Sequence, residues 1–508
     1  MEKSNRGSDP CPSKISSNLS INRRMLKNLF GESQDVKMRE FEFGTSKKFR
    51  ALVLFIDGMV DKNVVNHQII EPIMYSDKMT RDFTFEKISS LKDILDSLVA
   101  IGEVTEVATL DDAVQGALMG DTVLFVEGQV KCLILGSKGF DKRNVNEPDS
   151  EVVIRGPKES FTENLRTNTV LLRRKIKNSE LRMIHFTMGK RTKTPVVITY
   201  IEGLVKPGIV EEIKRRLKQV EADGILDSGY IEQYIEDAPF SIFPTVGNTE
   251  KPDVLAARLL EGRAGVIVDG SPVALTVPFL FIEKFQSAED YYSRPWFASF
   301  IRACRYLAFA LCVLTPALYV AFSAFHPGII PTKLLYTMIA ARQGVPFSAF
   351  FEAVVMILLF ELLREAGLRL PKPVGQTIGI VGALIMGESA VSAGLVSPLL
   401  LICVALSAVS GFVVSGLNGV QNILRLIYLV LAATLGGLGV AFGLFFTLLH
   451  LSVLKSFGRP YLQPFAPLEP RDLKDSVVRA PLWKMILRPT AFSRNRVRFS
   501  NTKNKGDR

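Results

Sequence analysis

The chain has 508 residues, 47% of them hydrophobic, and a formal net charge of +11 at pH 7. A chain of this length is expected to hold several domains. Its start, MEKSNRGSDPCPSKISSNLS, has no apolar core and continues Met with Glu, which argues against a secretory signal and against N-myristoylation. The five cysteines are scattered and fit neither a disulfide framework nor a CxxC metal site.

Residues 1–39 are rich in Ser, Asn, Lys and Arg. This composition predicts a disordered basic N-terminal tail, with one short basic helix near residues 22–30.

The next part of the chain repeats itself. FRALVLFIDGMVDKNVVNHQII begins at Phe49, and TPVVITYIEGLVKPGIVEEIK begins at Thr194, so the two phrases align at an offset of 145 residues. Each phrase has a β-branched run, an acidic-Gly pair and then a helical pattern. We therefore expect a strand, a tight turn and a helix in both copies.

A second pair of phrases supports the repeat. DTVLFVEGQVKCLIL, from Asp121, resembles AGVIVDGSPVALTV, from Ala264, at an offset close to the first. Both predict hairpins that turn at an acidic residue followed by Gly. The sequence thus predicts two related α/β subdomains, residues 40–194 and 195–290. A basic linker helix at residues 161–178 ends the first.

No enzyme signature stands in these copies. They contain no Walker lysine, GxGxxG, metal-spaced histidine cluster or nucleophile elbow. An acid in the IDG and IEG turns repels phosphate, so a turn-stabilising role explains it better. We expect no catalytic residue, no cofactor and no metal site.

Residues 291–455 differ in composition. The stretches 306–325, 389–424 and 426–454 contain no charged side chain, and about 20 apolar residues span the hydrocarbon core of a bilayer. We predict an all-α polytopic membrane domain of four to six spans, so the α/β half would face the cytoplasm. The predicted spans are Phe300–Phe325, Pro346–Leu363, Leu395–Val414 and Ile423–Leu454.

The segment 373–394 leaves two topologies open. Its PKP start and the Gly375 and Gly379 pair favour close helix packing. If this segment and the four spans each cross once, the basic C-terminal tail lies outside, against the positive-inside rule. Either residues 373–394 are re-entrant, or another segment near the Gly436–Gly439 break adds a crossing.

The tail, residues 456–508, follows a predicted span and is strongly basic. We interpret it as a cytoplasmic segment held near anionic lipid rather than as a nucleic-acid-binding tail.

Two membrane acids need an explanation. Glu352 lies one turn into an apolar span and predicts a buried ion pair, with Arg302, Arg305 or Arg342 as its partner. Glu388 has no nearby base and stands among serines and glycines. It either lines a hydrated path, where a ring of carboxylates favours cations, or is a packed glutamate bonded to serine. The pore-lining candidates are Gly382, Leu384, Ile385, Gly387, Glu388, Ser389, Val391 and Ser392.

Several long phrases resemble the A subunit of GerA-type spore germination receptors. They are EPDSEVVIRGPKESFTENLRTN (147–168), YIEDAPFSIFPTVGNTEKPDVLAARLLEGRAGVIVDGSPVALTVPFLFIEKFQSAEDYY (234–292), FHPGIIPTKLL (325–335) and LRLPKPVGQTIGIVGALIMGESAVSAGLVSP (368–398). The resemblance runs from about residue 40 to residue 490. A SpoVAF-like paralogue shares the same architecture, and these phrases do not separate the two.

The resemblance implies a multi-pass protein of the spore inner membrane with both terminal regions on the core side. It implies assembly with itself, as a pentamer, and with a transporter-like B subunit and a C-subunit lipoprotein. The implied activity is a nutrient-gated channel for monovalent cations that triggers germination. The alternatives are a non-conducting receptor or scaffold subunit and, with less support, a secondary transporter. Membrane lipid is an expected partner, and nucleic acid is not.

Overall fold

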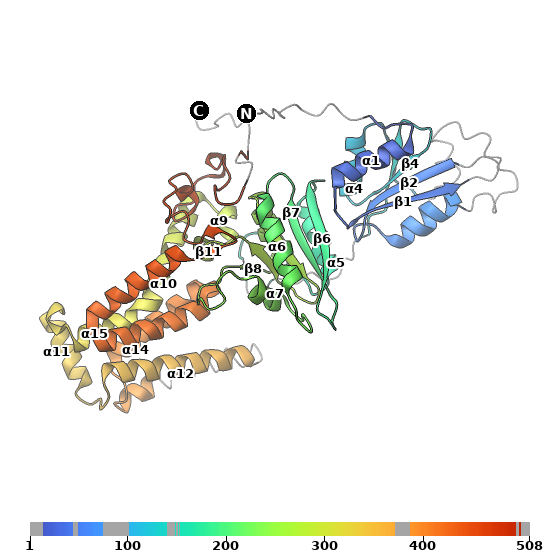
Figure 1. Ribbon diagram of the computed structural model, residues 1–508. Helices are drawn as coiled ribbons and strands as arrows, with labels where there is room; N and C mark the ends of the chain where they lie inside the picture. Colours follow the sequence, from blue (N-terminus) through green and yellow to red (C-terminus); the bar gives the residue numbers. More distant parts are fainter. Residues whose placement is uncertain are drawn as a thin grey trace. The chain divides into compact units, whose positions relative to one another are not determined.

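The computed structural model describes residues 14–43, 49–74, 101–139, 148, 151, 153–370, 387–493 and 497–498. The chain divides into two compact units. The first consists of Met1–Glu236, Val246–Pro278 and Ile486–Lys503, and the second of Asp237–Thr245, Phe279–Met485 and Asn504–Arg508. The first unit is an α/β region and the second is helical (Figure 1).

The α/β unit contains two antiparallel five-stranded sheets with the same topology. The first has the order β1-β2-β4-β5-β3 and the second β6-β7-β9-β10-β8. The first sheet comprises β1 (Val36–Phe43), β2 (Phe49–Ile56), β3 (Val104–Val107), β4 (Thr122–Val126) and β5 (Cys132–Leu135). The second comprises β6 (Leu181–Met188), β7 (Thr194–Ile201), β8 (Gly247–Thr249), β9 (Ala264–Val268) and β10 (Ala274–Val277).

The strand registers repeat as well. Val36 pairs with Ile56 in the first sheet, and Leu181 pairs with Ile201, both 145 residues further on, in the second. The β4–β5 and β9–β10 pairings are likewise equivalent. The two related subdomains predicted from the repeated phrases are therefore present, and the acidic-Gly pairs turn the chain at the ends of β2, β4, β7 and β9.

Helices cover the sheets by burying one apolar stripe each. On the first sheet, α1 (Leu19–Phe30) and α4 (Leu110–Leu118) pack with Leu52 and Leu54, whereas η1 (Val64–Ile70) packs with Ala51 and Val53 on the other face. On the second sheet, α5 (Leu165–Lys175) and α8 (Pro252–Leu260) share one core with Val197 and Ile267. Figure 1 shows α6 (Pro207–Gln219) and α7 (Ser228–Ile235) in front of this sheet.

Two predicted boundaries differ from the structure. Residues 1–39 were predicted to be a disordered tail with one short helix near residues 22–30. The helix is present as α1 and buries Leu19, Leu26 and Phe30, and β1 pairs with β2. Likewise, the predicted linker helix at residues 161–178 is α5, which packs on the second sheet. Helices α1 and α5 are equivalent in the repeat. The second subdomain therefore begins before residue 195. This was not predicted because the many basic side chains of α1 and α5 obscure the apolar stripe of each helix in the sequence.

In the part of the chain that the structure describes, the helical unit contains four long helices. They are α10 (Pro295–Ala324), α12 (Ala349–Arg369), α14 (Pro398–Val413) and α15 (Asn418–Val453). Shorter elements are η3 (Phe281–Phe285), α9 (Glu289–Tyr292), η4 (Pro327–Ile329) and α11 (Thr332–Arg342). Helix α10 packs against both α14 and α15 and forms the centre of this unit.

Helix α15 reverses direction at Gly436. This residue has φ 61° and ψ −137°, a combination that is essentially restricted to glycine, and a Cβ there would lie 2.8 Å from the Cβ of Phe325. Tyr428 and Thr447 form a side-chain hydrogen bond of 3.0 Å, although a straight helix would place them about 28 Å apart at 1.5 Å per residue. Residues 418–435 and 437–453 are therefore two antiparallel arms.

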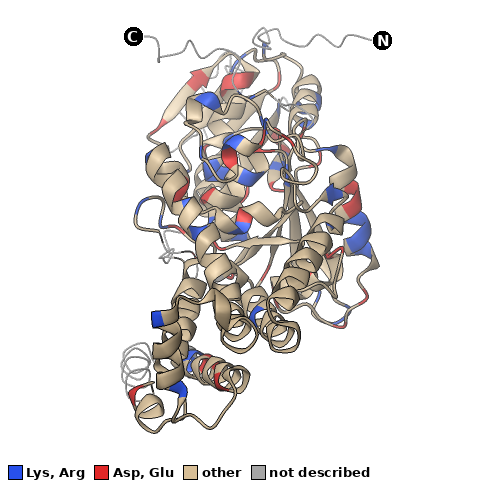
Figure 2. Ribbon diagram, turned by 90° about the vertical axis from the view of Figure 1, so that its left-hand side faces the viewer, with Lys and Arg blue, Asp and Glu red and all other residues tan. Residues whose placement is uncertain are grey.

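The surface of the helical unit is apolar. Among the described residues, α10 and α15 are long and apolar enough to cross a membrane, and α14 is a shorter apolar helix. Figure 2 shows long uncharged stretches on these helices, in contrast to the charged α/β region. Large apolar side chains that are more than half exposed occur on all four long helices, among them Phe300, Leu307, Leu362, Ile402, Val409, Phe412, Leu438, Phe445 and Phe446.

The C-terminal segment, residues 456–508, was predicted to be a basic cytoplasmic tail held near anionic lipid, and its described residues are partly folded. A short hairpin pairs β11 (Lys455–Ser456) with β12 (Arg459–Pro460). Further on, Phe492 is buried in the α/β unit beneath the guanidinium of Arg263, and Ser493 pairs with Val205. The buried apolar residues of this segment explain its folding, because its basic charge alone would keep it in solvent.

Candidate functional site in the helical unit

The segment 387–397 contains the described part of the predicted pore lining. Residues 387–392 are helical, and Glu388, Ser389 and Ser392 are exposed on this turn, whereas Gly387 is buried and Val391 half-buried. The other predicted residues of this site and of the helix-packing pair lie outside the described residues: Gly375, Gly379, Gly382, Leu384 and Ile385.

Glu388 and Glu352 lie in opposite environments. Glu388 is exposed on the single chain, so its charge keeps access to water or to a neighbouring chain. Glu352, in the first turn of α12, is only 1% exposed, and its Oε1 lies 3.0 Å from Nη2 of Arg342 on α11. Of the three bases considered for Glu352, the structure therefore selects Arg342.

The other two bases belong to a separate buried cluster. Nε of Arg302 lies 2.8 Å from Oδ2 of Asp290, and Arg305 also pairs with this carboxylate. Arg302 pairs in addition with Asp475, which arrives from the C-terminal segment. No local sequence pattern indicated this cluster, because its acids lie 12 residues before Arg302 and far beyond it in the chain.

A third buried charge, Arg425 on α15, was not identified from the sequence. Its Nη2 donates to Oδ1 of Asn422 and to Sγ of Cys312 on α10, and its Nη1 lies 3.8 Å from Oε1 of Glu361 on α12. Glu361 also pairs with Arg364, as expected at a helix end. The cluster joins three long helices. An arginine alone in an apolar stretch was the available signal, since such a charge requires a partner.

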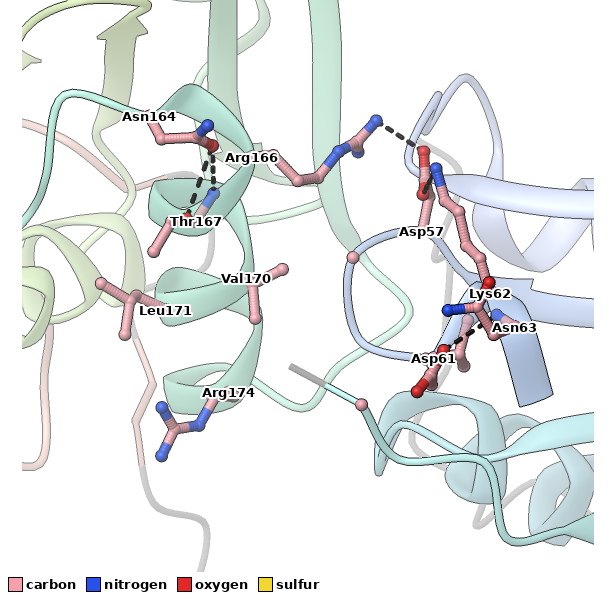
Figure 3. A pocket seen from close by; sticks show the side chains of 13 residues that line it. Asp57, Asp61, Lys62, Asn63, Asn164, Arg166, Thr167, Val170, Leu171 and Arg174 are labelled. Carbon is pink, nitrogen blue, oxygen red and sulfur yellow. Dashed lines mark hydrogen bonds and ion pairs between the residues drawn. The ribbon is translucent and has the colours of Figure 1, made fainter. Parts of the chain in front are cut away.

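The α/β unit contains a charged pocket of about 460 Å³ between the β2 turn and α5 (Figure 3). Asp57 accepts there from Arg166 of α5 at 2.5 Å, and Nζ of Lys62 lies 3.1 Å from its other oxygen. Ligand pockets are mostly apolar with a few convergent polar groups. In this pocket the central carboxylate of Asp57 is instead paired with Arg166 and Lys62, which is typical of a structural contact between two elements.

The described residues contain no group of three or more His, Cys, Asp or Glu side chains placed to hold a metal ion. The candidate site therefore consists of the exposed side chains of Glu388, Ser389 and Ser392, together with the buried polar contacts of Glu352.

Comparison with known proteins gives the family. The model described as "Bacillus/Clostridium GerA spore germination protein" matches residues 24–491. The chain belongs to this GerA family. Spore germination protein KA of Bacillus subtilis (strain 168) is 39% identical over 485 residues, which cover 95% of this chain and 88% of that protein. Spore germination protein GerLA of Bacillus cereus is 38% identical over 458 residues, covering 90% and 92% respectively.

The chain is also similar to an uncharacterized membrane protein and to a domain of known structure. The uncharacterized membrane protein YfkQ of Bacillus subtilis (strain 168) is 38% identical, with 94% of this chain and 92% of that protein covered. A crystal structure of the N-terminal domain of the A subunit of the Bacillus megaterium spore germinant receptor GerK3 is 32% identical. That comparison covers 53% of this chain and 98% of that chain with a TM-score of 0.41. The GerA family match begins at residue 24, inside α1, and so includes part of the range predicted to be a tail.

Proposed function

We propose that this GerA-family chain is the A-type subunit of a nutrient-responsive receptor and that several copies, five by the family resemblance, form a cation channel in the spore inner membrane. The observation that carries the proposal is the exposed polar face of residues 387–392. It presents a carboxylate and two serine hydroxyls in a unit whose exposed large side chains are mostly apolar. Around a symmetry axis, such a face forms a ring that attracts cations.

The reversal at Gly436 supports a membrane path with both terminal regions on the spore-core side. Each arm of α15 has 17 or 18 residues, or about 25–27 Å at 1.5 Å per residue, close to the bilayer core. There are five crossings in this path: the two arms of α15 and the helices α10, α12 and α14. The predicted segment 373–394 adds a sixth, and its residues 373–386 lie outside the described ones. An even number satisfies the positive-inside rule.

The proposed partners follow from this role. A transporter-like B subunit and a C-subunit lipoprotein would complete the receptor, and nutrient binding would shift the ring between closed and open arrangements. A ligand achieves such a shift only through different affinities for the two arrangements. The domain limits in the proposal are a cytoplasmic α/β region up to about residue 290, the membrane domain at 291–455 and the C-terminal segment at 456–508.

The test is potassium flux from liposomes that contain the chain with its B and C partners. We expect Glu388→Gln to lower cation flux and selectivity while assembly persists. A unit charge about 4 Å away contributes about 1 kcal/mol in water, so its loss should lower the local cation concentration about fivefold.

Glu365→Gln is the matched control, because Glu365 forms an exposed helix pair with Arg369. Wild-type flux and selectivity in Glu388→Gln would remove this residue from the pore. Silence of a correctly assembled wild-type complex would favour the scaffold role over the channel.

A further inference from the structure

The start of α14 is held by a carboxylate from another helix. Oε2 of Glu352, on α12, accepts a hydrogen bond of 3.0 Å from the backbone N–H of Ser397. Ser397 is the N-cap of α14 and makes no side-chain cap bond to its own helix. A negative charge at a helix N-terminus is favourable because of the helix dipole. Glu352 thus supplies the charge that the α14 start does not supply for itself.

The same carboxylate and the same serine connect further elements. The other oxygen of Glu352 pairs with Arg342 of α11, and Oγ of Ser397 lies 3.1 Å from the hydroxyl of Tyr319 on α10. Ser397 is fully buried. Four helices therefore meet at one small polar site formed by Glu352, Arg342, Ser397 and Tyr319, which we call the α14 anchor.

The α14 anchor ends the segment that carries Glu388. Val396 lies eight positions after Glu388, is 3% exposed and directly precedes the anchored serine. A second contact lies between them. Gly394 has φ 66°, and a Cβ there would lie 3.0 Å from the carbonyl oxygen of Gly344 in the α11–α12 loop. The position of the Glu388 turn thus depends on α12 and on the loop before it.

We propose that Glu352 is a positioning residue, which holds segment 387–397 in the resting arrangement through the Ser397 N–H and releases it when the channel opens. This inference rests on the proposed channel function. The α14 anchor joins the segment that carries the polar face to three other helices. A movement of those helices would therefore change the position of Glu388. Glu361 lies on the same α12 helix and contacts Arg364, Asn422 and Arg425. Among the described residues it forms no hydrogen bond or ion pair with segment 387–397, and so it provides a comparison.

The experiment follows the position of the segment and the flux separately. Val396→Cys is introduced into full-length chain whose five native cysteines are replaced, and the rate of thiol labelling is measured in the assembled complex with B and C partners. Glu352→Leu removes both contacts of the carboxylate, whereas Glu352→Gln keeps an oxygen that accepts from Ser397. Glu361→Gln is the matched control on the same helix.

We expect Val396→Cys labelling to rise about tenfold in Glu352→Leu and less in Glu352→Gln, because the buried site opens more often. Potassium flux without nutrient should rise in the same order. Glu361→Gln should change neither, even if it lowers the amount of complex. A merely structural role would reduce complex in all three variants without this graded exposure.

Two results would overturn the inference. One is wild-type labelling in assembled Glu352→Leu complex, and the other is a fall in unliganded flux with increased labelling. If Glu352→Leu does not assemble, Glu352→Gln decides by the same readouts. If the wild-type complex does not conduct at all, the channel proposal fails, and the labelling rate alone still decides whether Glu352 positions the segment.

Discussion

The α/β unit and the helical unit arrange polar and apolar side chains in opposite ways. In the α/β unit the apolar side chains form the cores between the sheets and the helices that cover them. Figure 2 shows charged residues throughout this unit. In the helical unit large apolar side chains face outward, while Glu352, Gln421 and Arg425 are buried. One physical rule explains both patterns if the second unit is surrounded by lipid, since each unit then presents what its surroundings solvate.

The largest expected effect concerns a buried charge in the α/β unit. Nη2 of Arg173 lies 2.7 Å from Oδ2 of Asp35, and the side chains are 1% and 3% exposed. Arg173→Met leaves Asp35 buried without its partner, and we expect a loss of about 3–5 kcal/mol in the stability of this region. Thermal unfolding of the purified protein measures it.

Arg215→Met is the control for that measurement, because Arg215 pairs with Glu212 on the exposed face of α6. This change should lower stability far less than Arg173→Met, because an exposed ion pair is screened by water. Equal shifts in the two variants would mean that the Asp35–Arg173 pair is not shielded from solvent as its burial indicates.

An intermediate effect tests the surroundings of the helical unit. Phe445 is 60% exposed near the middle of the second α15 arm, and Val130 is 61% exposed in the α/β unit. We expect Phe445→Arg to cost about 2.5–3.5 kcal/mol through insertion of a charge into lipid. Val130→Arg should stay within about 0.5 kcal/mol.

The amount of correctly inserted protein in membranes measures this difference. Equal yields for the two variants would remove the distinction between a water-facing and a lipid-facing surface, and with it the membrane placement of the second α15 arm.

The smallest expected effect is the pH dependence of a solvent-exposed pair. Hydrogen bonds from Arg215, opposed by partial burial and helped by Arg216, lower the pKa of Glu212 from 4.5 to about 2. The folded state therefore favours the ionised carboxylate, and its contribution is present above pH 4.5 and is lost as the pH falls toward 2. We expect Glu212→Gln to cost less than about 1 kcal/mol at pH 7, because such pairs are screened by water.

The difference in unfolding midpoint between wild type and Glu212→Gln should shrink as the pH falls, and also at high salt. A difference that grows on acidification would contradict the assigned direction of the pKa shift.

The sequence predicted the features that depend on local pattern. The repeated phrases at Phe49 and Thr194 gave the equivalent strands β2 and β7, and the charge-free stretches gave the apolar helices. A short helix near residues 22–30 was predicted, but it was assigned to a disordered tail, because five of the twelve residues of α1 have basic or amide side chains and they follow a Ser- and Asn-rich start. The apolar stripe of a helix is visible only when the sheet that it covers is known.

The polar contacts behind the candidate site could not be predicted in full. A buried partner for Glu352 followed from the cost of an isolated charge, and three bases were compatible with that requirement. Its bond to the N–H of Ser397 spans 45 residues and involves backbone, so no residue type signals it. The exposure of Glu388 likewise depends on how the turn packs, whereas its isolation from bases was plain in the sequence.

The most direct test of the account is an image of the receptor complex purified in detergent or lipid, at a resolution that shows side chains. The account predicts several copies of this chain around a central hydrated opening, with Glu388 of each copy directed toward the axis. A single copy whose Glu388 contacts lipid, or is bound to a basic side chain away from any opening, would contradict it.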